Sequence, residues 1–250
     1  MCKTALTILG LALMAAAPAV AGQPVDNAVY AELLREHVHE GLVDYEGLLE
    51  DRGGLEACLD VLAGVAGNGL HPDEAFALPV NAYNAWTLKL VLDHYPLESV
   101  KDIGGWFTSP WDLETVRLGG RRLTLDELEH EIMRPRYDDS RLHMAVNCAS
   151  MSCPKLRSEP YEGEKLDEQL DDQARGFVND PSRNRLEGGV LRVNRIFDWY
   201  AEDFGGEAGV VEFVRRYADA PMRRLMEQAG AGLEVEYLDY DWSLNEWEGE

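Results

Sequence analysis

Two Gly-Gly dipeptides constrain the fold of this chain most strongly. Gly119-Gly120 lies within "ETVRLGGRRLTL", and Gly188-Gly189 lies within "RLEGGVLRV". Each pair separates two short runs that contain Val, Leu and Arg, and consecutive glycines supply the backbone conformation that a tight turn between antiparallel strands requires. We therefore predict a β-hairpin at each dipeptide.

Most of the remaining chain has helical periodicity. Apolar side chains at i, i+3, i+4 and i+7 form one face of a helix. The clearest stripes are Tyr30, Leu33, Leu34 and His37; Leu55, Cys58, Leu59 and Leu62; and Leu166, Leu170, Ala174 and Phe177. "LDELEHEIM" is also predicted to be a helix, because Thr124 and Glu127 form a capping box before it. Pro79 is expected near the start of a further helix, which Pro96 ends at or before Tyr95.

Two more strands complete the prediction. "LHMAVNC" alternates and contains Val146, and "LEVEYLDYDWSLN" supplies a final strand and tail. Helices with hairpins between them predict an α+β fold, a single domain in which several helices pack on an antiparallel sheet built from hairpins.

The first 21 residues have the pattern of a secretory signal peptide. Lys3 is their only charge, an apolar run follows, and Ala19-Val20-Ala21 forms a small-x-small cleavage site. Cleavage after Ala21 would leave one globular domain over residues 22–250, periplasmic or secreted. A membrane anchor is the alternative, but the run is short and ends in Pro18, and no later segment is long and apolar enough to span a bilayer.

The charge of the chain excludes one class of partner. It has 46 Asp and Glu residues against 23 Lys and Arg, a net charge of −23. Such a chain repels the phosphate backbone, so DNA and RNA are not expected to bind. A small molecule or a peptide remains the expected partner, and no pattern points to a cofactor.

The stretch "RLHMAVNCASMSCPKL" places a histidine ahead of two cysteines. His143 is suited to activate Cys148 or Cys153, since a nearby imidazole favours the nucleophilic thiolate. Residues five apart in a regular strand point to opposite faces, however, so His143 and Cys148 pair only if the chain bulges or turns between them. Cys58 falls on a helical stripe, and we predict it to be a buried apolar residue.

Two other interpretations of these cysteines stay open. Cys148 and Cys153 flank small residues in a chain expected to reach an oxidising space, which suits a disulfide. Metal ligation is disfavoured, because the close-spaced ligand pair typical of zinc sites is missing. No metal site is therefore predicted.

The segment "NAYNAWT" is a second candidate. Asn81 and Asn84 lie one helical turn apart, so both amides share a side, with Tyr83 and Trp86 close by. Such amides near a helix start are suited to orient a substrate carbonyl or carboxylate. Capping and core packing are the structural alternative.

Several motifs, in order, resemble one family. They are "LPVNAYNAWTLKLVLDHYPLESVKDIG", "SPWD", "LTLDELEH", "RLHMAVNCASMSCPKLRSEPY", "FDWYAEDFG" and "YDWSLN". Over roughly residues 40 to 245, the chain resembles the domain of unknown function 547 family of bacterial exported and plant proteins. The resemblance singles out Asn81, Tyr83, Asn84, Trp86, Glu129, His130, His143, Cys148, Ser150, Ser152, Cys153, Pro154, Asp198 and Trp199. It implies no particular reaction, but it makes His130, otherwise a solvated helix histidine, a candidate for the site.

The layout is more distantly similar to papain-like and transglutaminase-like thiol enzymes. Their nucleophile begins a helix, and their histidine heads a later strand. Here "NAYNAWTLKL" would be the helix and "HMAV" the strand start, but the helix carries asparagines and no cysteine. Either the layout is a coincidence, or the nucleophile has moved to Cys148 or Cys153, or the site is non-catalytic, and likeness of layout shows no activity by itself.

The leading hypothesis is thiol-dependent acyl hydrolysis or transfer at an amide-like bond. His143 would be the base for a cysteine nucleophile, and Asn84 would orient the carbonyl. Asp198 or Asp241 would orient the histidine.

The rival hypothesis is a non-catalytic binding module with a Cys148–Cys153 disulfide. It would present an aromatic-lined cleft to a peptide, a glycan or a protein partner. The expected cleft residues are Tyr83, Trp86, Trp106, Trp111 and Trp199.

Overall fold

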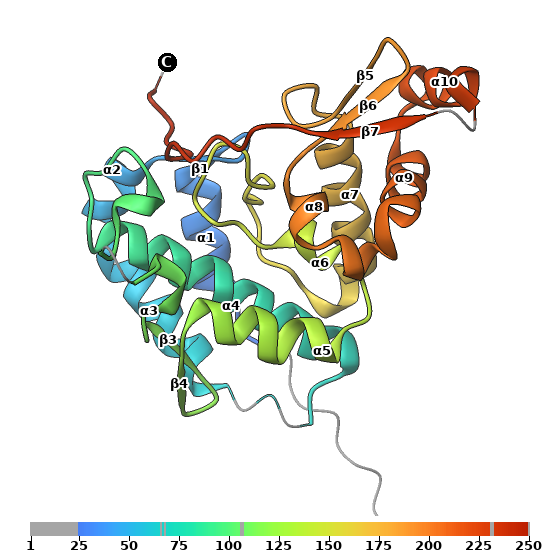
Figure 1. The fold of residues 1–250 in the computed structure, drawn as a ribbon. Helices are drawn as coiled ribbons and strands as arrows, with labels where there is room; N and C mark the ends of the chain where they lie inside the picture. Colours follow the sequence, from blue (N-terminus) through green and yellow to red (C-terminus); the bar gives the residue numbers. More distant parts are fainter. Residues whose placement is uncertain (1–24, 66, 68, 106–107, 231–232, 250) are drawn as a thin grey trace, which may run out of the picture.

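A helix of 21 residues, α4 (Pro72–Leu92), runs through the middle of the protein and is buried on nearly all sides. A helix that is apolar all round is typical of a core position. In the computed structural model, α2 (Tyr45–Glu50), α3 (Arg52–Gly64) and α7 (Leu166–Val178) contact α4, and α1 (Ala28–His37) packs on α3 (Figure 1). The structure describes residues 25–249 except 66, 68, 106, 107, 231 and 232. The predicted signal peptide, residues 1–21, and the cleft residue Trp106 lie outside the described residues.

The helical stripes are confirmed. Every residue of the three predicted stripes is buried, on α1, α3 and α7 respectively. Cys58 is 3 % exposed, as predicted for an apolar core residue. Burying a leucine side chain stabilises the fold by ~1.5–3 kcal/mol, so these stripes decide where the helices pack.

Pro79 was wrongly expected near a helix start. Pro72 occupies the first turn of α4, and Pro79 lies inside the helix. A proline has no N–H, so the carbonyl of Ala75, four residues earlier, loses its helical partner. The hydroxyl of Tyr137 donates a hydrogen bond to this carbonyl instead, which explains how the helix continues past Pro79.

Both predicted hairpins are present. β3 (Val116–Leu118) pairs antiparallel with β4 (Arg121–Leu123), and β5 (Arg185–Glu187) pairs antiparallel with β6 (Val190–Val193). The φ angles are 56° and 75° at the first Gly-Gly and 61° and 86° at the second, as two-residue turns of the I′ type require.

The α+β class is confirmed, but the strands do not form one antiparallel sheet. They form three small sheets, which include the pair β1 (Val38–His39) and β2 (Leu42–Val43). The largest is mixed, because β7 (Glu234–Tyr237) pairs parallel with β6. Helices, among them α3, α4 and α7, separate the hairpins along the chain, and the strands of the described residues are two to four residues long, too short to extend into one sheet.

The C-terminal part forms a second hydrophobic cluster beside α7. The predicted helices appear as α8 (Ile196–Trp199), α9 (Gly206–Tyr217) and α10 (Ala220–Ala229). Short 3-10 turns lie at Val100–Asp102, Pro110–Asp112, Gly163–Lys165 and Ala201–Phe204. After β7 the chain runs back across the molecule toward β1 (Figure 1), with isolated bridges to Ser150, Ser99 and Val43. This return segment ties both clusters together.

The predicted helix after the capping box is confirmed, but its central part is a π-helix, which was not predicted. Thr124 and Glu127 exchange hydrogen bonds of 2.8 and 2.9 Å between side chain and backbone. The helix then widens into a π-helical segment, Glu127–Met133 (η3), before α5 (Arg134–Arg136). Such segments recur at functional sites because they redirect side chains.

The predicted strand over "LHMAVNC" is wrong. Leu142–Ala145 forms one helical turn, α6, and the chain becomes extended only at Val146. The parity argument against His143 meeting Cys148 therefore does not apply.

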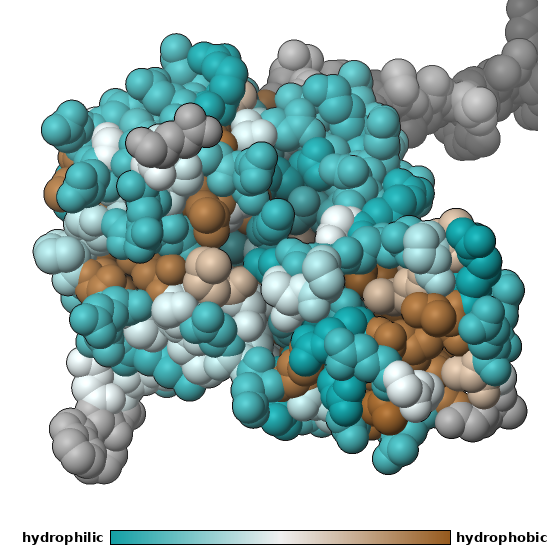
Figure 2. All heavy atoms as spheres, turned by 90° about the horizontal axis from the view of Figure 1, so that it is seen from above, coloured by the Kyte–Doolittle hydropathy of each residue, from teal (hydrophilic) through white to brown (hydrophobic). Residues whose placement is uncertain are grey.

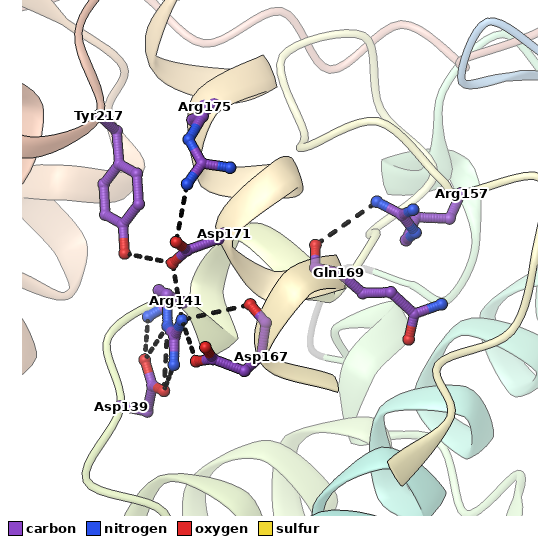
Figure 3. A network of polar contacts seen from close by, with 8 residues as sticks. All are labelled: Asp139, Arg141, Arg157, Asp167, Gln169, Asp171, Arg175 and Tyr217. Carbon is purple, nitrogen blue, oxygen red and sulfur yellow. Dashed lines mark hydrogen bonds and ion pairs between the residues drawn. The ribbon is translucent and has the colours of Figure 1, made fainter. Parts of the chain in front are cut away.

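Arg141, just before α6, holds this turn against α7. Its guanidinium donates to carboxylate oxygens of Asp139 at 2.7 Å, Asp171 at 2.7 Å and Asp167 at 2.8 Å (Figure 3). The hydroxyl of Tyr217 on α9 donates to Asp171 at 2.9 Å, so three elements meet at one network (Figure 3).

Seen from above, hydrophilic side chains cover most of the surface (Figure 2), in keeping with the acidic composition. Within the described residues, no helix is long and apolar enough to cross a membrane.

Candidate functional site

A cavity of about 230 Å³ lies where α4, η3, α6, α8 and the returning C-terminal segment meet. Its aromatic walls are Tyr83, Trp111, Trp199, Tyr200, Tyr240 and Trp242. The residues of the cavity lining whose side chains can carry out acid–base or nucleophilic chemistry are Asp126, Glu129, His130, His143, Cys148 and Cys153. Tertiary structure therefore brings the predicted histidine and both predicted cysteines to one cavity.

A tight turn presents Cys148 to the cavity. The side chain of Asn147 accepts a hydrogen bond from Ala149 N–H at 2.9 Å and donates to the carbonyl of Pro154 at 2.7 Å. Ala149 takes the positive φ of 61°, which non-glycine residues rarely adopt. The return segment then bonds to both sides of the turn, through Met151 N–H to Ser243 and Asn245 N–H to Ala149.

The thiol of Cys148 is surrounded by hydrogen-bonding groups. Its sulfur lies 3.0 Å from the hydroxyl of Ser150 and 3.3 Å from the hydroxyl of Tyr240. Burial disfavours the thiolate, but hydrogen bonds from Cys153, Ser150 and Tyr240 outweigh burial and lower the pKa of Cys148. These hydrogen bonds favour the thiolate form of Cys148, the form in which a cysteine is nucleophilic.

Cys153 has the opposite character. Its sulfur accepts a hydrogen bond from the N–H of Cys148 at 2.8 Å, and the residue is 3 % exposed. Burial and the neighbouring Cys148 raise the pKa of Cys153 well above its usual range. Cys58, Cys148 and Cys153, the cysteines of the described chain, are all free thiols.

The imidazole of His143 is held from three directions. Nε2 lies 2.7 Å from Oδ2 of Asp203, and the ring stacks on Tyr200 with centroids 4.0 Å apart. Arg134 binds both carboxylate oxygens of Asp203, at 2.6 and 2.9 Å. Burial lowers the pKa of His143 despite the nearby carboxylates of Glu129 and Asp203, which favours the neutral imidazole.

The other imidazole nitrogen has no hydrogen-bond partner. Nδ1 of His143 and Oε1 of Glu129 are both buried, unpaired and 3.9 Å apart. Buried polar atoms normally have partners, so these two atoms are available to bond to a group or a water molecule in the cavity. Neither nitrogen of His143 bonds to a cysteine sulfur among the described residues.

The π-helical segment places His130 at the cavity as well. His130 is partly exposed, its Nδ1 lies 2.6 Å from Arg134, and its ring stacks on Tyr200 at 6.0 Å. His130 therefore lies at the edge of the cavity, near His143, where its side chain also contacts solvent.

The two helix asparagines do not face the cavity. Asn84 donates to the carbonyl of Ala145 at 3.0 Å and accepts from the N–H of Asn147 at 2.8 Å. Asn81 makes the same pair of bonds, each 2.8 Å, with the backbone of Tyr161. Both amides act as backbone partners for a neighbouring segment. The Asn84 amide holds the chain between His143 and Cys148, and the carbonyl-orienting role expected of it stays a prediction.

The expected partner of the histidine is also corrected. Asp198 pairs with Arg195, and Asp241 accepts hydrogen bonds from Ser243. The residue bonded to His143 is Asp203, which was missed although it lies in the quoted motif "FDWYAEDFG". Tyr240, in the motif "YDWSLN", was missed in the same way.

The expected aromatic cleft is assembled in part. Tyr83, Trp111 and Trp199 line the cavity, and Trp199 is 47 % exposed. Trp86 is buried in the core and lies outside the cavity lining.

Comparison with known proteins shows that part of the chain is similar to one protein family. Residues 68–178 match the family model described as "Protein of unknown function, DUF547". This span contains α4, η3, α6, the Cys148 turn and all of α7, while Asp203 and Tyr240 lie beyond it. Neither the curated proteins nor the solved structures gave a match. Through this central segment, which supplies the histidine and both thiols of the cavity, the chain resembles the DUF547 family.

Proposed function

We propose that the cavity is the active site of a thiol-dependent acyl hydrolase or transferase acting on an amide-like bond, with Cys148 as the nucleophile. The observation that carries the proposal is the environment of its sulfur. Two hydroxyl groups lie within 3.3 Å of it, the pKa is lowered, and an imidazole nitrogen without a partner belongs to the same cavity. A thiolate nucleophile with a separate proton carrier is the minimum that acyl transfer through a thioester requires.

His143 is the proposed proton carrier. Because Nε2 faces the carboxylate of Asp203, its proton stays on Nε2 and the lone pair lies on Nδ1. In acylation Nδ1 takes the proton that the thiol of Cys148 loses and gives it to the leaving amine. In deacylation Nδ1 takes a proton from the water or acceptor that attacks the thioester. Since His143 and Cys148 share no hydrogen bond, the substrate lies between them, and the thiolate is stabilised by Ser150, Tyr240 and Cys153.

The walls favour a substrate with a flat or apolar group next to the reacting carbonyl. Trp199, Tyr240 and Trp242 stack on one another with centroids 4.4–5.6 Å apart. Aromatic faces bind rings and aliphatic chains. A peptide or a small amide satisfies this description.

A direct test uses p-nitrophenyl acetate, an activated ester that acylates thiolates. The mature chain should release nitrophenol and carry acetyl on Cys148, located by peptide mass mapping. Cys148→Ser should abolish both signals, Cys58→Ser should leave both unchanged, and His143→Gln should accumulate the acetylated form because deacylation slows. Acetylation that persists at the same rate in Cys148→Ser would overturn the proposal.

A non-catalytic binding cleft is the second candidate, and the exposure of Trp199 favours it. A large aromatic side chain that is 47 % exposed beside a cavity is typical of a contact residue for ligands. Titration of intrinsic tryptophan fluorescence with peptide and glycan libraries tests it. Saturable quenching in Cys148→Ser that is lost in Trp199→Ala, together with no acylation of the unmodified protein, would favour this function.

We further propose that the protein is exported after cleavage at Ala21. The charge and hydropathy pattern of residues 1–21 supports this. N-terminal sequencing of the protein from cell fractions tests it, with Gly22 as the expected first residue.

A further inference from the structure

The buried histidine His37, on the opposite end of the core from η3, has both ring nitrogens without hydrogen-bond partners. Its side chain is 6 % exposed, and it lies at the last position of α1. Unpartnered buried imidazoles are uncommon, because leaving a polar group unpaired costs ~1–3 kcal/mol. A partner other than a hydrogen-bonding group of the protein is therefore expected for the ring nitrogens of His37.

Acidic residues converge on this ring from two other elements. Nε2 lies 3.7 Å from Oδ2 of Asp51, at the junction of α2 and α3. Ligand atoms of Glu36, His37 and Asp51 all lie within 4.8 Å of one another. Oxygen and nitrogen ligands about 2.0–2.2 Å from a tetrahedral ion lie roughly 3.3–3.5 Å apart, so small side-chain rotations bring this set to coordination distance.

A carboxylate also lies near the other ring nitrogen, where metal-binding histidines have a partner, but it is too far away for a hydrogen bond in this structure. Nδ1 lies 3.9 Å from Oδ2 of Asp44, whose Oδ1 caps α2 by accepting from Gly47 N–H at 2.8 Å. A carboxylate behind a ligating imidazole fixes the tautomer that leaves Nε2 free for the ion. A Cβ at Gly47 would lie 3.1 Å from Nδ1 and 2.2 Å from Asp44, so glycine is required for this close packing.

We propose that Glu36, His37 and Asp51 bind a divalent transition-metal ion of the zinc class, with Asp44 as the outer partner of the histidine. An imidazole with two carboxylates suits zinc and similar ions, whereas calcium and magnesium prefer oxygen ligands throughout. Two carboxylates balance the charge of the ion. Glu36 and Asp51 are exposed, so water completes the coordination, and the ion cross-links the end of α1 to the α2–α3 junction.

The test measures zinc chloride binding to the mature chain carrying Cys148→Ser and Cys153→Ser, which removes the thiol cavity as a competing site. Isothermal titration should show one zinc per chain, and zinc should raise the melting temperature relative to EDTA. Asp51→Asn and Glu36→Gln should each weaken binding by about tenfold or more. Asp44→Asn, which still caps α2, should weaken it by about 10–100-fold.

Glu227→Gln is the matched control, since it removes one exposed acid elsewhere and should leave the affinity unchanged. A charged His37 that only pairs with Asp44 and Asp51 makes a different prediction. In that case Asp51→Asn would lower the melting temperature equally with zinc and with EDTA, and no saturable binding would be seen. Either that result, or zinc affinity unchanged by all three substitutions, would overturn the proposal.

Discussion

Nε2 of His143 lies 2.7 Å from Oδ2 of Asp203, a carboxylate 60 residues further along the chain. The same carboxylate forms a bidentate ion pair with Arg134. Because Arg134 neutralises Asp203, the carboxylate orients the imidazole without requiring it to be charged. In hydrolase triads, too, a carboxylate orients the imidazole by a hydrogen bond, and the likeness extends to that role only.

Asp203→Asn should therefore impair proton transfer more than folding. An amide in this position donates to Nε2 and moves the imidazole proton to Nδ1, which removes the proposed base. Ester turnover should fall by roughly 10²–10⁴-fold, and KM should fall with it because only deacylation slows, while the acetylation burst on Cys148 remains. Asp198→Asn is the control and should retain turnover, and equal loss in both variants would argue against the role of Asp203.

The thiol of Cys148 should react with iodoacetamide at lower pH than an ordinary cysteine. Burial disfavours the thiolate, but hydrogen bonds from Cys153, Ser150 and Tyr240 outweigh burial and lower the pKa of Cys148, so the rate should reach half its maximum at a lower pH than for a cysteine in an unstructured peptide. Tyr240→Phe and Ser150→Ala each remove a donor to the thiolate and should shift the curve to higher pH. Cys58 is the internal control, because burial raises its pKa to about 12 and it should label only after unfolding. A curve for Tyr240→Phe that overlays the wild-type curve would disprove the contribution of that hydroxyl.

Asn84→Leu should destabilise the protein and disturb the Cys148 turn. The amide bonds to the carbonyl of Ala145 and the N–H of Asn147, and both backbone groups would be left buried without these partners. A loss of about 2–5 kcal/mol in the free energy of unfolding is expected from urea titration. Asn81→Leu makes a comparable loss at Tyr161, away from the turn, so only Asn84→Leu should also slow labelling of Cys148.

Arg141→Met should weaken the network between α6, α7 and α9. Its partner Asp171 is partly buried, and a cost of about 1–3 kcal/mol is expected for leaving it unpaired. Asp167 is 88 % exposed, so Asp167→Asn should cost about 0–1 kcal/mol and is the matched control. If both variants have the same unfolding midpoint in urea, the network does not stabilise the fold.

The same network should make stability depend on acid. Burial raises the pKa of Asp171, but hydrogen bonds from Arg141 and Tyr217 outweigh it, so the folded-state pKa is lowered. A carboxyl group whose pKa is lower in the folded state than in the unfolded state stabilises the fold at pH values above its unfolded-state pKa of about 3.9. This contribution to the free energy of unfolding is lost as the pH falls through the folded-state pKa. The acid-induced loss should be smaller in Arg141→Met than in the wild type when followed by circular dichroism.

Tyr137 and Pro79 should be coupled. Tyr137→Phe keeps the ring stacked on Phe76 but leaves the carbonyl of Ala75 without the hydroxyl that replaces its helical donor. The expected cost is about 1–2 kcal/mol. In a Pro79→Ala background the new N–H supplies the helical bond, so the same change should cost less, and a double-mutant cycle in urea measures the difference. Equal costs in both backgrounds would show that the hydroxyl does not compensate for the proline.

Local patterns in the sequence predicted the elements that local physics determines. Consecutive glycines allow positive φ, so both hairpins were found, and side chains at helical spacing located the buried faces of α1, α3 and α7. The capping box before η3 was found for the same reason, because its bonds join residues three apart. The α+β class follows from these elements.

Only the tertiary structure decided how the site is built. "LHMAV" alternates like a strand, but it forms α6 because Arg141 and Asn84 hold it against distant helices. His143 meets Asp203 across 60 residues, and Cys148 meets Tyr240 across 92. Such contacts depend on which surfaces pack together, and the side-chain period of a short segment does not encode its distant partner. The sequence by itself therefore determined both hairpins, most of the helices and the candidate histidine and thiols. Packing decided that these residues share one cavity and which side chains surround them, because contacts across 60 to 92 residues are set by the surfaces that pack together.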